Sequence, residues 1–517
     1  MIRLRFWSSA ELSPDRIALV DPRGIEWTAG ELLDASNAMV HSLRSIGMRT
    51  GDGLAVVLPN GTEMVVAYLA AMQAGWYLTP INHHLVGHEI AHILQDCEAK
   101  VLIAHERFAT QVCAAVEALG GTGLRCYSIG EIEGFEPIKD LLADAPRTKP
   151  DHLEAGTVMY YTSGTTGRPK GVRRPLPGTH PEDATVPFAD MLALLGIESH
   201  PDDVHLCGSP LYHTAVLAFA ASALHTGQTV VLMDKFTPAA MLDLIDRYRV
   251  TNSHMVPTQF HRLLSLSDDE RAEFDISTLR YVIHGAAPCP PDVKRKIIEW
   301  WGPVVYEYYG TTEGGGTYVT SQDWLARPGT VGRPWLGADI KILDDDGNEV
   351  PPGTEGTVYI LLGDAGFEYY KDESKTSASR IGDYFTVGDI GLLDEDGFLF
   401  LKDRSADLII AGGVNIYPVE IENALLGHPA VGDVAVFGAP DPDLGERVVA
   451  VVEPTRGWVA DDALRDALLE HCTSTLARFK VPRELTFSDA LPRDPSGKLY
   501  KRKLREAYRL AATAPTA

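Results

Sequence analysis

The chain has 517 residues, which is more than one hydrophobic core usually supports, so two or more domains are expected. Its composition, 45% hydrophobic and 23% charged, is typical of a soluble globular protein. The formal net charge of -25 argues against nucleic acid or an anionic membrane surface as the main partner.

Cysteine usage and the N-terminal sequence bear on the compartment. Six cysteines are scattered without C-x-x-C pairs, and the N-terminus lacks the apolar run of a secretory signal. We therefore expect reduced thiols and a cytoplasmic location. The most apolar stretch, residues 215–224, is too short to span a bilayer, so no transmembrane segment is predicted.

Apolar strand-like runs alternate with helical patterns over most of the first four hundred residues. Such alternation favours an α/β fold with parallel sheets covered by helices. The elements predicted here are strands 54–58, 76–80, 101–104 and 229–233 and helices 62–75 and 238–247.

The pattern changes towards the C-terminus. From Gly329, turns rich in Gly and Pro separate short strands, which indicates a smaller β-rich subdomain. A compact α+β pattern follows Lys402, so we predict an N-terminal domain of residues 1–402 and a C-terminal domain of residues 403–517. The elements predicted in the second domain are helices 418–426 and 460–476 and strands 434–437, 448–452 and 485–487.

The most informative segment is the run of residues 160–171, which is rich in hydroxyl groups and glycines. Residues 158–161 indicate a strand that leads into a loop. Glycines let a backbone approach a ligand closely, while exposed N–H groups, hydroxyls and a lysine bind anionic oxygens. The spacing differs from the G-x-x-x-x-G-K-[ST] loop, because Arg168 and Pro169 interrupt it. The predicted phosphate-binding residues are Thr162, Ser163, Gly164, Thr165, Thr166, Gly167 and Lys170.

This run resembles the signature of the adenylate-forming superfamily, which contains acyl- and aryl-CoA synthetases, firefly luciferase and the adenylation domains of peptide synthetases. Further motifs of that family occur in order along nearly the whole chain. The resemblance implies a large N-terminal AMP-binding domain with a β-rich subdomain, followed by a small, mobile α+β C-terminal domain.

Residues 308–313, Tyr-Tyr-Gly-Thr-Thr-Glu, resemble the family's Y-G-x-T-E motif. Glu313 is a hard oxygen ligand suited to Mg²⁺ between phosphates, and we expect Thr165 to be a second metal ligand. The resemblance implies that Thr312 bonds the α-phosphate and that the ring of Tyr309 offers a flat face to adenine. A small-residue turn upstream is similar to the family's purine pocket. The remaining residues expected at the nucleotide are Gly285, Ala286, Ala287, Gly310 and Thr311.

Two further residues match the family's ribose site. Asp389 resembles the aspartate that accepts both ribose hydroxyls, and two charge-assisted hydrogen bonds would fix the orientation of the nucleoside. Arg404 matches the partner arginine of that aspartate. Either residue alone could belong to a surface ion pair, but their order after the phosphate loop and Glu313 favours the nucleotide site.

Two C-terminal segments resemble the parts of the family that act in the two half-reactions. Gly412 and Gly413 would let the pantetheine arm of coenzyme A run along the backbone. Residues 491–498 carry Lys498, which would lie between the substrate carboxylate and the α-phosphate and offset charge during the displacement. In the family the C-terminal domain rotates between the two steps.

The hinge is where the chain departs from the family pattern. The usual hinge residue is Asp or Lys, whereas this chain has Ala406. Asp403 and Ser405 are therefore alternative pivots.

The acyl side is indicated by residues 210–215, which resemble the motif whose histidine, here His213, lies beside the substrate carboxylate. Amino-acid-activating relatives carry Phe-Asp in this motif, and its absence favours a simple carboxylic acid. Gly310 stands where acetate-specific relatives have a pocket-closing tryptophan, and the glycine run 314–316 follows it. We therefore expect a deep acyl cavity and a medium-chain, long-chain or bulky acid, such as a fatty acid or a steroid side-chain acid.

The segment 173–187 is long and rich in proline. It stands where the family commonly has a short polar connection after the phosphate loop. A substrate-side flap and a solvated loop are both open interpretations of it.

Together these motifs imply an AMP-forming acyl-CoA synthetase, an acid–thiol ligase. Its substrates would be a small-molecule carboxylic acid, ATP and coenzyme A, with Mg²⁺ as cofactor, and a homodimer stays open. The alternative is an acyl-AMP ligase that loads a separate carrier protein; because no carrier domain follows residue 517, we expect coenzyme A as the acceptor. Luciferase-type oxidation and a non-catalytic binding protein are less favoured, the latter because all the expected polar site residues are present.

Overall fold

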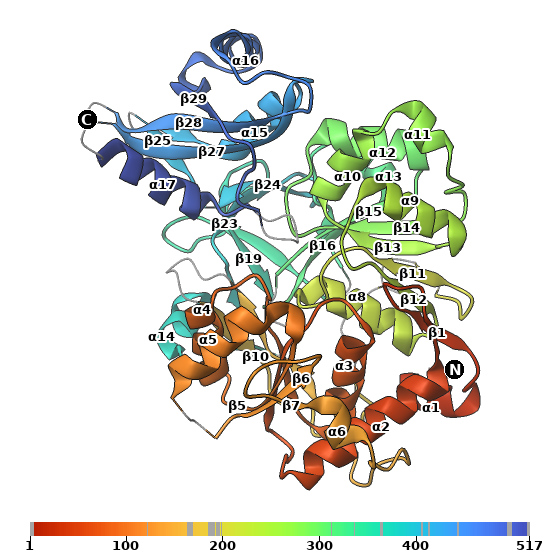
Figure 1. Cartoon of the computed structure of the whole chain (residues 1–517). Helices are drawn as coiled ribbons and strands as arrows, with labels where there is room; N and C mark the ends of the chain where they lie inside the picture. Colours follow the sequence, from red (N-terminus) through yellow and green to blue (C-terminus); the bar gives the residue numbers. More distant parts are fainter. Residues whose placement is uncertain are drawn as a thin grey trace.

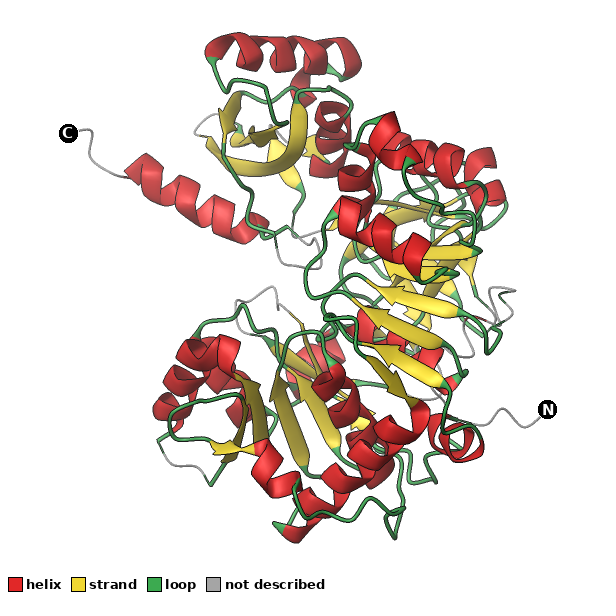
Figure 2. Ribbon diagram, turned by 45° about the vertical axis from the view of Figure 1, so that its right-hand side comes forward, coloured by secondary structure: helices red, strands yellow, loops and turns green. Residues whose placement is uncertain are grey.

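The computed structural model shows two large helix-covered sheets, a strand-rich region beside them, and a C-terminal unit at the top of Figure 1. Figure 2 shows the same layers from a second direction. The structure describes residues 5–120, 123–162, 169–184, 192, 197, 199–311, 313–335, 337–361, 366–404, 407–411, 414–441, 444–493 and 499–513.

The first large sheet has six strands in the order β7-β6-β5-β3-β4-β8, and all of its pairings are parallel. Parallel pairing requires crossovers, which the helices between the strands supply. The strands are β3 (Gly53–Val57), β4 (Tyr77–Pro80), β5 (Ala99–His105), β6 (Arg125–Ile129), β7 (Glu136–Pro137) and β8 (Thr157–Val158). The helices of this region are α3 (Thr62–Ala74), α4 (Gly87–Asp96), η1 (Glu106–Phe108), α5 (Ala109–Leu119) and α6 (Ile138–Leu142).

The second large sheet has nine strands in the order β17-β16-β15-β14-β13-β11-β12-β1-β2. Its centre is parallel, and antiparallel strands close both edges. The strands are β1 (Ile17–Val20), β2 (Glu26–Thr28), β11 (Val204–Cys207), β12 (Thr229–Leu232), β13 (Asn252–Met255), β14 (Tyr281–His284), β15 (Val305–Gly310), β16 (Gly316–Val319) and β17 (Arg333–Pro334). The helices are α1 (Phe6–Leu12), α2 (Ala29–Ser45), α8 (Thr214–His225), α9 (Pro238–Arg247), α10 (Pro257–Leu264), α11 (Asp268–Ala272), α12 (Pro291–Trp301) and α13 (Ser321–Ala326).

The two sheets share one central helical layer. Side chains from both sheets and from α2, α3 and α8 form a single buried cluster, whereas α4 and α5 cover the outer face of the six-stranded sheet and α9, α10 and α12 that of the nine-stranded sheet. Successive side chains of a strand point to opposite faces of the sheet: on β12, Val230 lies in the central cluster and Val231 in the outer one. The predicted α/β class with parallel sheets is confirmed.

The strand-rich region contains two smaller sheets. One has the order β21-β22-β19-β23-β24, with β18 paired to β19, and the other has the order β20-β10-β9. The elements are β9 (Tyr160–Thr162), β10 (Lys170–Arg173), β18 (Ile340–Leu343), β19 (Gly356–Leu361), β20 (Glu368–Tyr369), α14 (Glu373–Ala378), β21 (Arg380–Ile381), β22 (Tyr384–Phe385), β23 (Asp389–Leu393) and β24 (Leu399–Arg404).

The C-terminal unit has hydrophobic clusters of its own, formed by β27, β28 and the helices that cover them. A hydrogen bond of 2.8 Å from Tyr417 to Glu355 joins it to the strand-rich region. The elements are β25 (Ile409–Ala411), β26 (Val414–Ile416), α15 (Pro418–Leu426), β27 (Val431–Asp441), β28 (Gly445–Pro454), α16 (Asp462–Thr475), η2 (Arg478–Lys480), β29 (Glu484–Phe487) and α17 (Lys501–Thr513).

Two elements differ from the sequence-based expectation. The strand predicted over residues 158–161 is two strands in different sheets: β8 closes the six-stranded sheet, and β9 begins the phosphate hairpin after Met159. Helix α17 was not predicted. Among the described residues, no helix combines the length and the apolar character needed to cross a membrane.

Candidate active site

The predicted phosphate loop connects two strands that pair with each other. β9 and β10 pair antiparallel, with Thr162 opposite Lys170. The loop residues of the prediction, Ser163, Gly164, Thr165, Thr166 and Gly167, lie outside the described residues.

Both arms of this hairpin are tied to the surrounding elements. Tyr161 donates a 2.6 Å hydrogen bond to Asp96 at the end of α4. The guanidinium of Arg173 lies 4.1 Å from the ring centre of Tyr77 and 4.4 Å from that of Tyr370. Cation–π contacts of one arginine with two rings tie β10 to the six-stranded sheet and to the segment after β20.

Lys170, the predicted phosphate-binding lysine, forms an ion pair with Asp372. The two side chains are 18% and 28% exposed, so the pair lies partly out of water at the end of the hairpin turn. A phosphate bound in the turn would compete with Asp372 for this ammonium.

Glu313 is buried, and two neighbours hold it. The hydroxyl of Tyr369 donates to its carboxylate over 2.7 Å, and the guanidinium of Arg174 donates to its backbone carbonyl over 2.7 Å. Burial lowers the pKa of Arg174, and the charge of Glu313 acts in the opposite direction. Burial also raises the pKa of Tyr369, as does its bond to Glu313, so the phenol keeps the proton that it donates.

The donor set at Glu313 fits a magnesium ion. A carboxylate has about four acceptor positions, and Tyr369 uses one of them. Mg²⁺ in nucleotide sites is typically bound by one or two protein oxygens together with phosphates and water. Glu313 alone therefore gives the kind of oxygen site that Mg²⁺ uses beside a triphosphate.

Tyr309 and Asp389, predicted separately for adenine and ribose, meet in the structure. The hydroxyl of Tyr309 donates a 2.6 Å hydrogen bond to the carboxylate of Asp389, which is buried at the start of β23. Asp389 also stands opposite Arg404 in the pairing of β23 with β24, although the side chain of Arg404 lies outside the described residues. Residues from β15, β23 and β24 thus converge.

The turn after β14 is built for close approach. A Cβ atom at Gly285 would lie 2.6 Å from the ring of Tyr308, so no side chain fits there. Ala286 has a φ of 69°, a left-handed conformation that is uncommon for residues other than glycine. Ala287 follows, and the turn presents backbone and methyl groups next to β15, as a flat purine would require.

His213 lies at the first turn of α8, directly before Thr214. The hydroxyl of Tyr160, on the strand that leads into the phosphate turn, donates to the carbonyl of Thr214 over 3.4 Å. The acyl motif and the phosphate hairpin are therefore neighbours. His254 lies buried near His213. Burial lowers the pKa of His254 to about 3, and the neighbouring His205 and His213 lower it further.

The space beside Gly310 is filled by Trp335. A Cβ atom at Gly310 would lie 3.1 Å from the carbonyl of Gly315 and 3.6 Å from the ring of Trp335. A Cβ atom at Gly316 would lie 2.0 Å from the carbonyl of Tyr309 and 2.7 Å from the Trp335 ring. The glycine run thus allows close packing of backbone and indole among the described residues. The deep acyl cavity stays a prediction.

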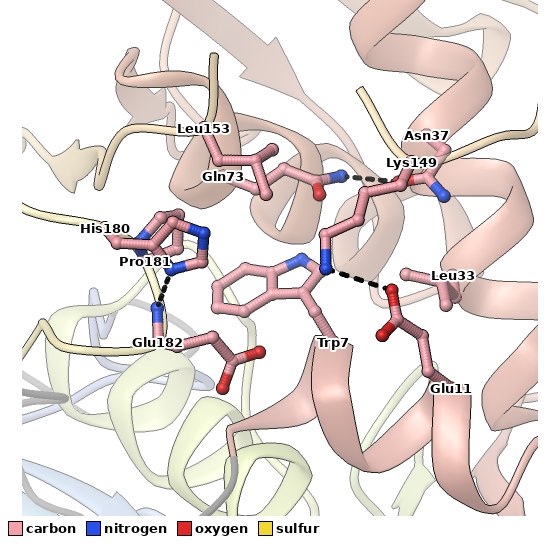
Figure 3. Close-up of a pocket in the computed structure, with 10 residues that line it drawn as sticks. All are labelled: Trp7, Glu11, Leu33, Asn37, Gln73, Lys149, Leu153, His180, Pro181 and Glu182. Carbon is pink, nitrogen blue, oxygen red and sulfur yellow. Dashed lines mark hydrogen bonds and ion pairs between the residues drawn. The ribbon is translucent and has the colours of Figure 1, made fainter. Parts of the chain in front are cut away.

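The described part of segment 173–187 is anchored at its far end to the N-terminal helix. The Glu182 carboxylate accepts hydrogen bonds from the backbone N–H groups of Arg5 and Ser8, over 2.9 and 2.8 Å, at the start of α1. Pro181 is buried, and beside it lies a cavity of about 10 Å³, lined by residues that include Trp7 (Figure 3). That volume is about one water molecule. As far as residue 184 the segment runs along the surface, with residues 177–180 exposed and Glu182 bonded to the start of α1. A substrate-side flap and a solvated loop both stay predictions for the segment as a whole.

Comparison with known proteins agrees with this geometry. The model of the AMP-binding enzyme family matches residues 6–368, and the model of the AMP-binding enzyme C-terminal domain matches residues 420–498. The chain belongs to the AMP-binding enzyme family.

The similarity to the curated relatives, which are acyl-activating enzymes, extends over nearly the whole length of both proteins. The chain is 33% identical over 512 residues to the long-chain-fatty-acid–CoA ligase FadD13 of Mycobacterium tuberculosis, covering 98% of each protein. It is 33% identical to a feruloyl-CoA synthase of an Amycolatopsis species, covering 96% of this chain and 97% of the relative. It is 31% identical to the fatty acid–[acyl-carrier-protein] ligase ScoC of Streptomyces coeruleorubidus, covering 93% and 91%.

Solved structures of the superfamily share the fold. The amide bond synthetase McbA of Marinactinospora thermotolerans aligns with a TM-score of 0.83 at 27% identity, covering 97% of this chain and 99% of that one. The o-succinylbenzoate-CoA synthetase of Bacillus subtilis, solved with its acyl-adenylate, aligns with a TM-score of 0.81 at 29% identity, covering 97% and 98%. The family match and the CoA ligases among the relatives confirm the prediction of an AMP-forming acid–thiol ligase.

Several predicted site residues of this AMP-binding enzyme lie outside the described part of the chain. The structure therefore does not test their placement, and their roles stay predictions. They are Thr312, the hinge candidates Ser405 and Ala406, the glycines Gly412 and Gly413, and Lys498, together with the side chains of Thr162, Asp403 and Arg404.

The structure adds neighbours that the motifs did not include. Arg174 was part of the unusual Arg-Arg-Pro segment, and this departure was the signal that could have singled it out. Tyr369, Asp372 and Trp335 carry no such signal, because each reaches the site from a separate strand-rich segment through tertiary packing.

Proposed function

We propose that this enzyme is an acyl-CoA synthetase, which joins a carboxylic acid to coenzyme A by way of an acyl-adenylate. The observation that carries the proposal is the 2.6 Å hydrogen bond between Tyr309 and Asp389, at the end of the strand that leads to buried Glu313. The ring of Tyr309 is thereby oriented by the carboxylate that would grip the ribose. Purine, ribose and phosphate positions then follow one another along β15 and β23.

In the first step a carboxylate oxygen of the acid attacks the α-phosphorus of ATP. The bond from that phosphorus to the bridging oxygen breaks, and pyrophosphate leaves with the electron pair. Lys170 and the backbone of the phosphate turn would hold the departing phosphates, and Lys498 would offset charge at the α-phosphate. Magnesium bound by Glu313, and by Thr165 as predicted, would neutralise phosphate charge.

In the second step the thiolate of coenzyme A attacks the carbonyl carbon of the acyl-adenylate, and AMP leaves. Gly412 and Gly413 would border the pantetheine arm. Rotation of a C-terminal domain that begins near Asp403 would exchange Lys498 for these glycines. Support for such a unit comes from its separate hydrophobic clusters.

For the acid we propose a medium-chain, long-chain or bulky hydrophobic carboxylate. Apolar and aromatic groups on the inner face of the nine-stranded sheet support an apolar acyl site: Phe219, Ile283 and Tyr308 cluster there, with Trp335 packed against them. Because Trp335 fills the space beside Gly310, a long acyl group would pass along this indole or displace it.

The test is a reaction panel with ATP and Mg²⁺, a series of acids, and coenzyme A either present or omitted. We expect pyrophosphate release with a subset of hydrophobic acids, and AMP and thioester only when coenzyme A is added. Acyl-AMP that accumulates and never passes to coenzyme A would contradict the proposal.

That outcome would favour a second candidate, a ligase that transfers the acyl group to another acceptor. The relatives supply the reason to consider it, since ScoC is a ligase for an acyl carrier protein and McbA is an amide bond synthetase. Replacing coenzyme A with a phosphopantetheinylated carrier protein, and separately with a simple amine, distinguishes these acceptors.

A further inference from the structure

The loop between β11 and α8, residues 208–213, carries His213 into the site. It is deeply placed: Ser209 is 2% exposed and Leu211 is 1% exposed. A buried loop must find hydrogen-bond partners for its backbone groups, since leaving them unpaired costs free energy. The partners of this loop therefore decide where His213 stands.

Asn60, from the other large sheet, supplies two of these bonds and one more to the neighbouring segment at Met233. Its amide nitrogen donates to the carbonyl of Ser209 and to the carbonyl of Met233, each over 2.9 Å. Its amide oxygen accepts from the N–H of Leu211 over 2.8 Å. Asn60 follows β3 of the six-stranded sheet, whereas all three partners follow strands of the nine-stranded sheet, so one side chain fixes the loop across the boundary between the sheets.

A second buried amide holds the start of the same loop. Gln259, in the first turn of α10, donates to the carbonyl of Gly208 over 3.1 Å and accepts from the N–H of Val256 over 3.0 Å. Both Asn60 and Gln259 are less than a tenth exposed. The loop is thus held by two neutral amides, each of which uses its donor and its acceptor together.

The held segment passes directly into His213. The N–H of His213 donates to the carbonyl of Pro210 over 3.1 Å, which closes a tight turn after Asn60's last contact. The carbonyl of His213 then accepts from Leu217 in the first turn of α8. A shift of Ser209 and Leu211 would therefore move His213 as well.

We propose that Asn60, supported by Gln259, is a positioning residue that sets His213 for the carboxylate of the acid substrate. This inference rests on the proposed function, in which His213 lies beside that carboxylate. An amide is required at position 60 because two carbonyls need donors and one N–H needs an acceptor. An aspartate of the same size cannot donate to both carbonyls.

The first test is Asn60→Asp in the full-length protein, with ATP and the acid varied separately and thioester formation measured. We expect the KM for the acid to rise about tenfold, because buried carbonyls lose their donors, while the KM for ATP changes less than about twofold. The matched control is Asn37→Asp: Asn37 is also buried and bridges distant segments, accepting from Gln73 and donating to the carbonyl of Arg147. Equal effects of the two substitutions on the KM for the acid would overturn the proposal.

The second test asks whether Asn60 acts through His213. In a His213→Ala background, Asn60→Asp is expected to raise the KM for the acid by less than about a further twofold, because the effects of coupled residues are not additive. A full additional tenfold effect would show a general structural role and overturn the proposal. If Asn60→Asp does not fold, Gln259→Glu is measured in the same way, with the same expected direction.

Measurements on the wild-type enzyme and on His213→Ala distinguish failure of the positioning role of Asn60 from failure of the proposed function. An unchanged KM for the acid in His213→Ala, with thioester still formed, would overturn the positioning role alone. Failure of the wild type to form acyl-AMP with any acid would contradict the proposed function itself.

Discussion

The proposed nucleotide side of the site is held by charged groups and phenols, whereas the proposed acyl side is held by neutral amides and aromatic rings. On the nucleotide side, Tyr309 bonds Asp389 and Tyr369 bonds Glu313. On the acyl side, Asn60 bonds backbone carbonyls, and Trp335 packs against glycine. The difference fits the ligands that we propose for the two sides. A triphosphate and a ribose require charge and oriented acceptors, while an apolar acid requires a shaped wall with few polar groups.

The largest expected effect lies on the nucleotide side. Asp389→Asn removes the charge that would accept the ribose hydroxyls and also weakens the bond from Tyr309. We expect kcat/KM for ATP to fall about 100-fold, the size of effect that losing two charge-assisted bonds gives. Steady-state kinetics with ATP varied checks this, and Asp345→Asn, at an exposed turn of the same region, is the control. An unchanged KM for ATP would remove Asp389 from the ribose site.

An intermediate effect is expected from Tyr369→Phe, which removes the hydroxyl that holds Glu313 while keeping the ring. Residues that orient a metal ligand typically change metal affinity or activity by about tenfold or more. Activity should therefore fall about tenfold at limiting Mg²⁺ and recover as Mg²⁺ is raised. Tyr384→Phe, which removes a phenol bond to Asp339 away from the site, is the matched control. Loss that excess Mg²⁺ does not relieve would contradict the role of Glu313 as a metal ligand.

On the acyl side we expect a change of preference and not a loss of activity. Trp335→Leu removes part of the indole that fills the space beside Gly310. Longer or bulkier acids should gain several-fold in kcat/KM relative to shorter ones, because each added methylene would find apolar contact worth about 0.8 kcal/mol. Competition between acids of two lengths, read by mass spectrometry of the thioesters, checks this. Trp458→Leu, at a half-exposed tryptophan of the C-terminal unit, is the control; an identical product ratio in both variants would exclude Trp335 from the acyl site.

Outside this ranking of effects on activity, a further prediction concerns folded stability in acid. Burial lowers the pKa of His254 to about 3, from 6.5. Below pH 6.5 the unfolded chain binds a proton that the folded protein does not, so folded stability falls by about 1.4 kcal/mol per pH unit from this histidine. Chemical denaturation across this range should show a shallower slope for His254→Gln than for the wild type. The exposed His88→Gln controls for removal of a histidine, and an unchanged slope in His254→Gln would contradict burial of a neutral imidazole.

The same contrast explains how far the sequence could predict the structure. Helix α9 was predicted with the correct ends, because Thr237 caps it and Pro238 occupies its first turn. Glu313 and Asp389 could be proposed from their motifs because a charged ligand restricts the residue types that can bind it; the structure shows both buried. Features of this kind depend on residues close together in the sequence, so they can be predicted from it.

The acyl side was less predictable because its geometry is tertiary. Nothing near Asn60 in the sequence indicates that it bonds Ser209 and Met233, which lie far along the chain. The sequence around Gly310 likewise does not indicate that Trp335, delivered by another segment, packs beside it. Partners that are chosen by packing become visible only in three dimensions.

The central claim, that the acid is activated on the α-phosphorus of ATP, is tested most directly by isotope transfer. The enzyme is incubated with ATP, Mg²⁺, coenzyme A and a substrate acid whose carboxylate carries oxygen-18, and the products are analysed by mass spectrometry. Attack of the carboxylate on the α-phosphorus predicts that AMP acquires one labelled oxygen and that pyrophosphate acquires none. Label in pyrophosphate or inorganic phosphate, with unlabelled AMP, would contradict the account.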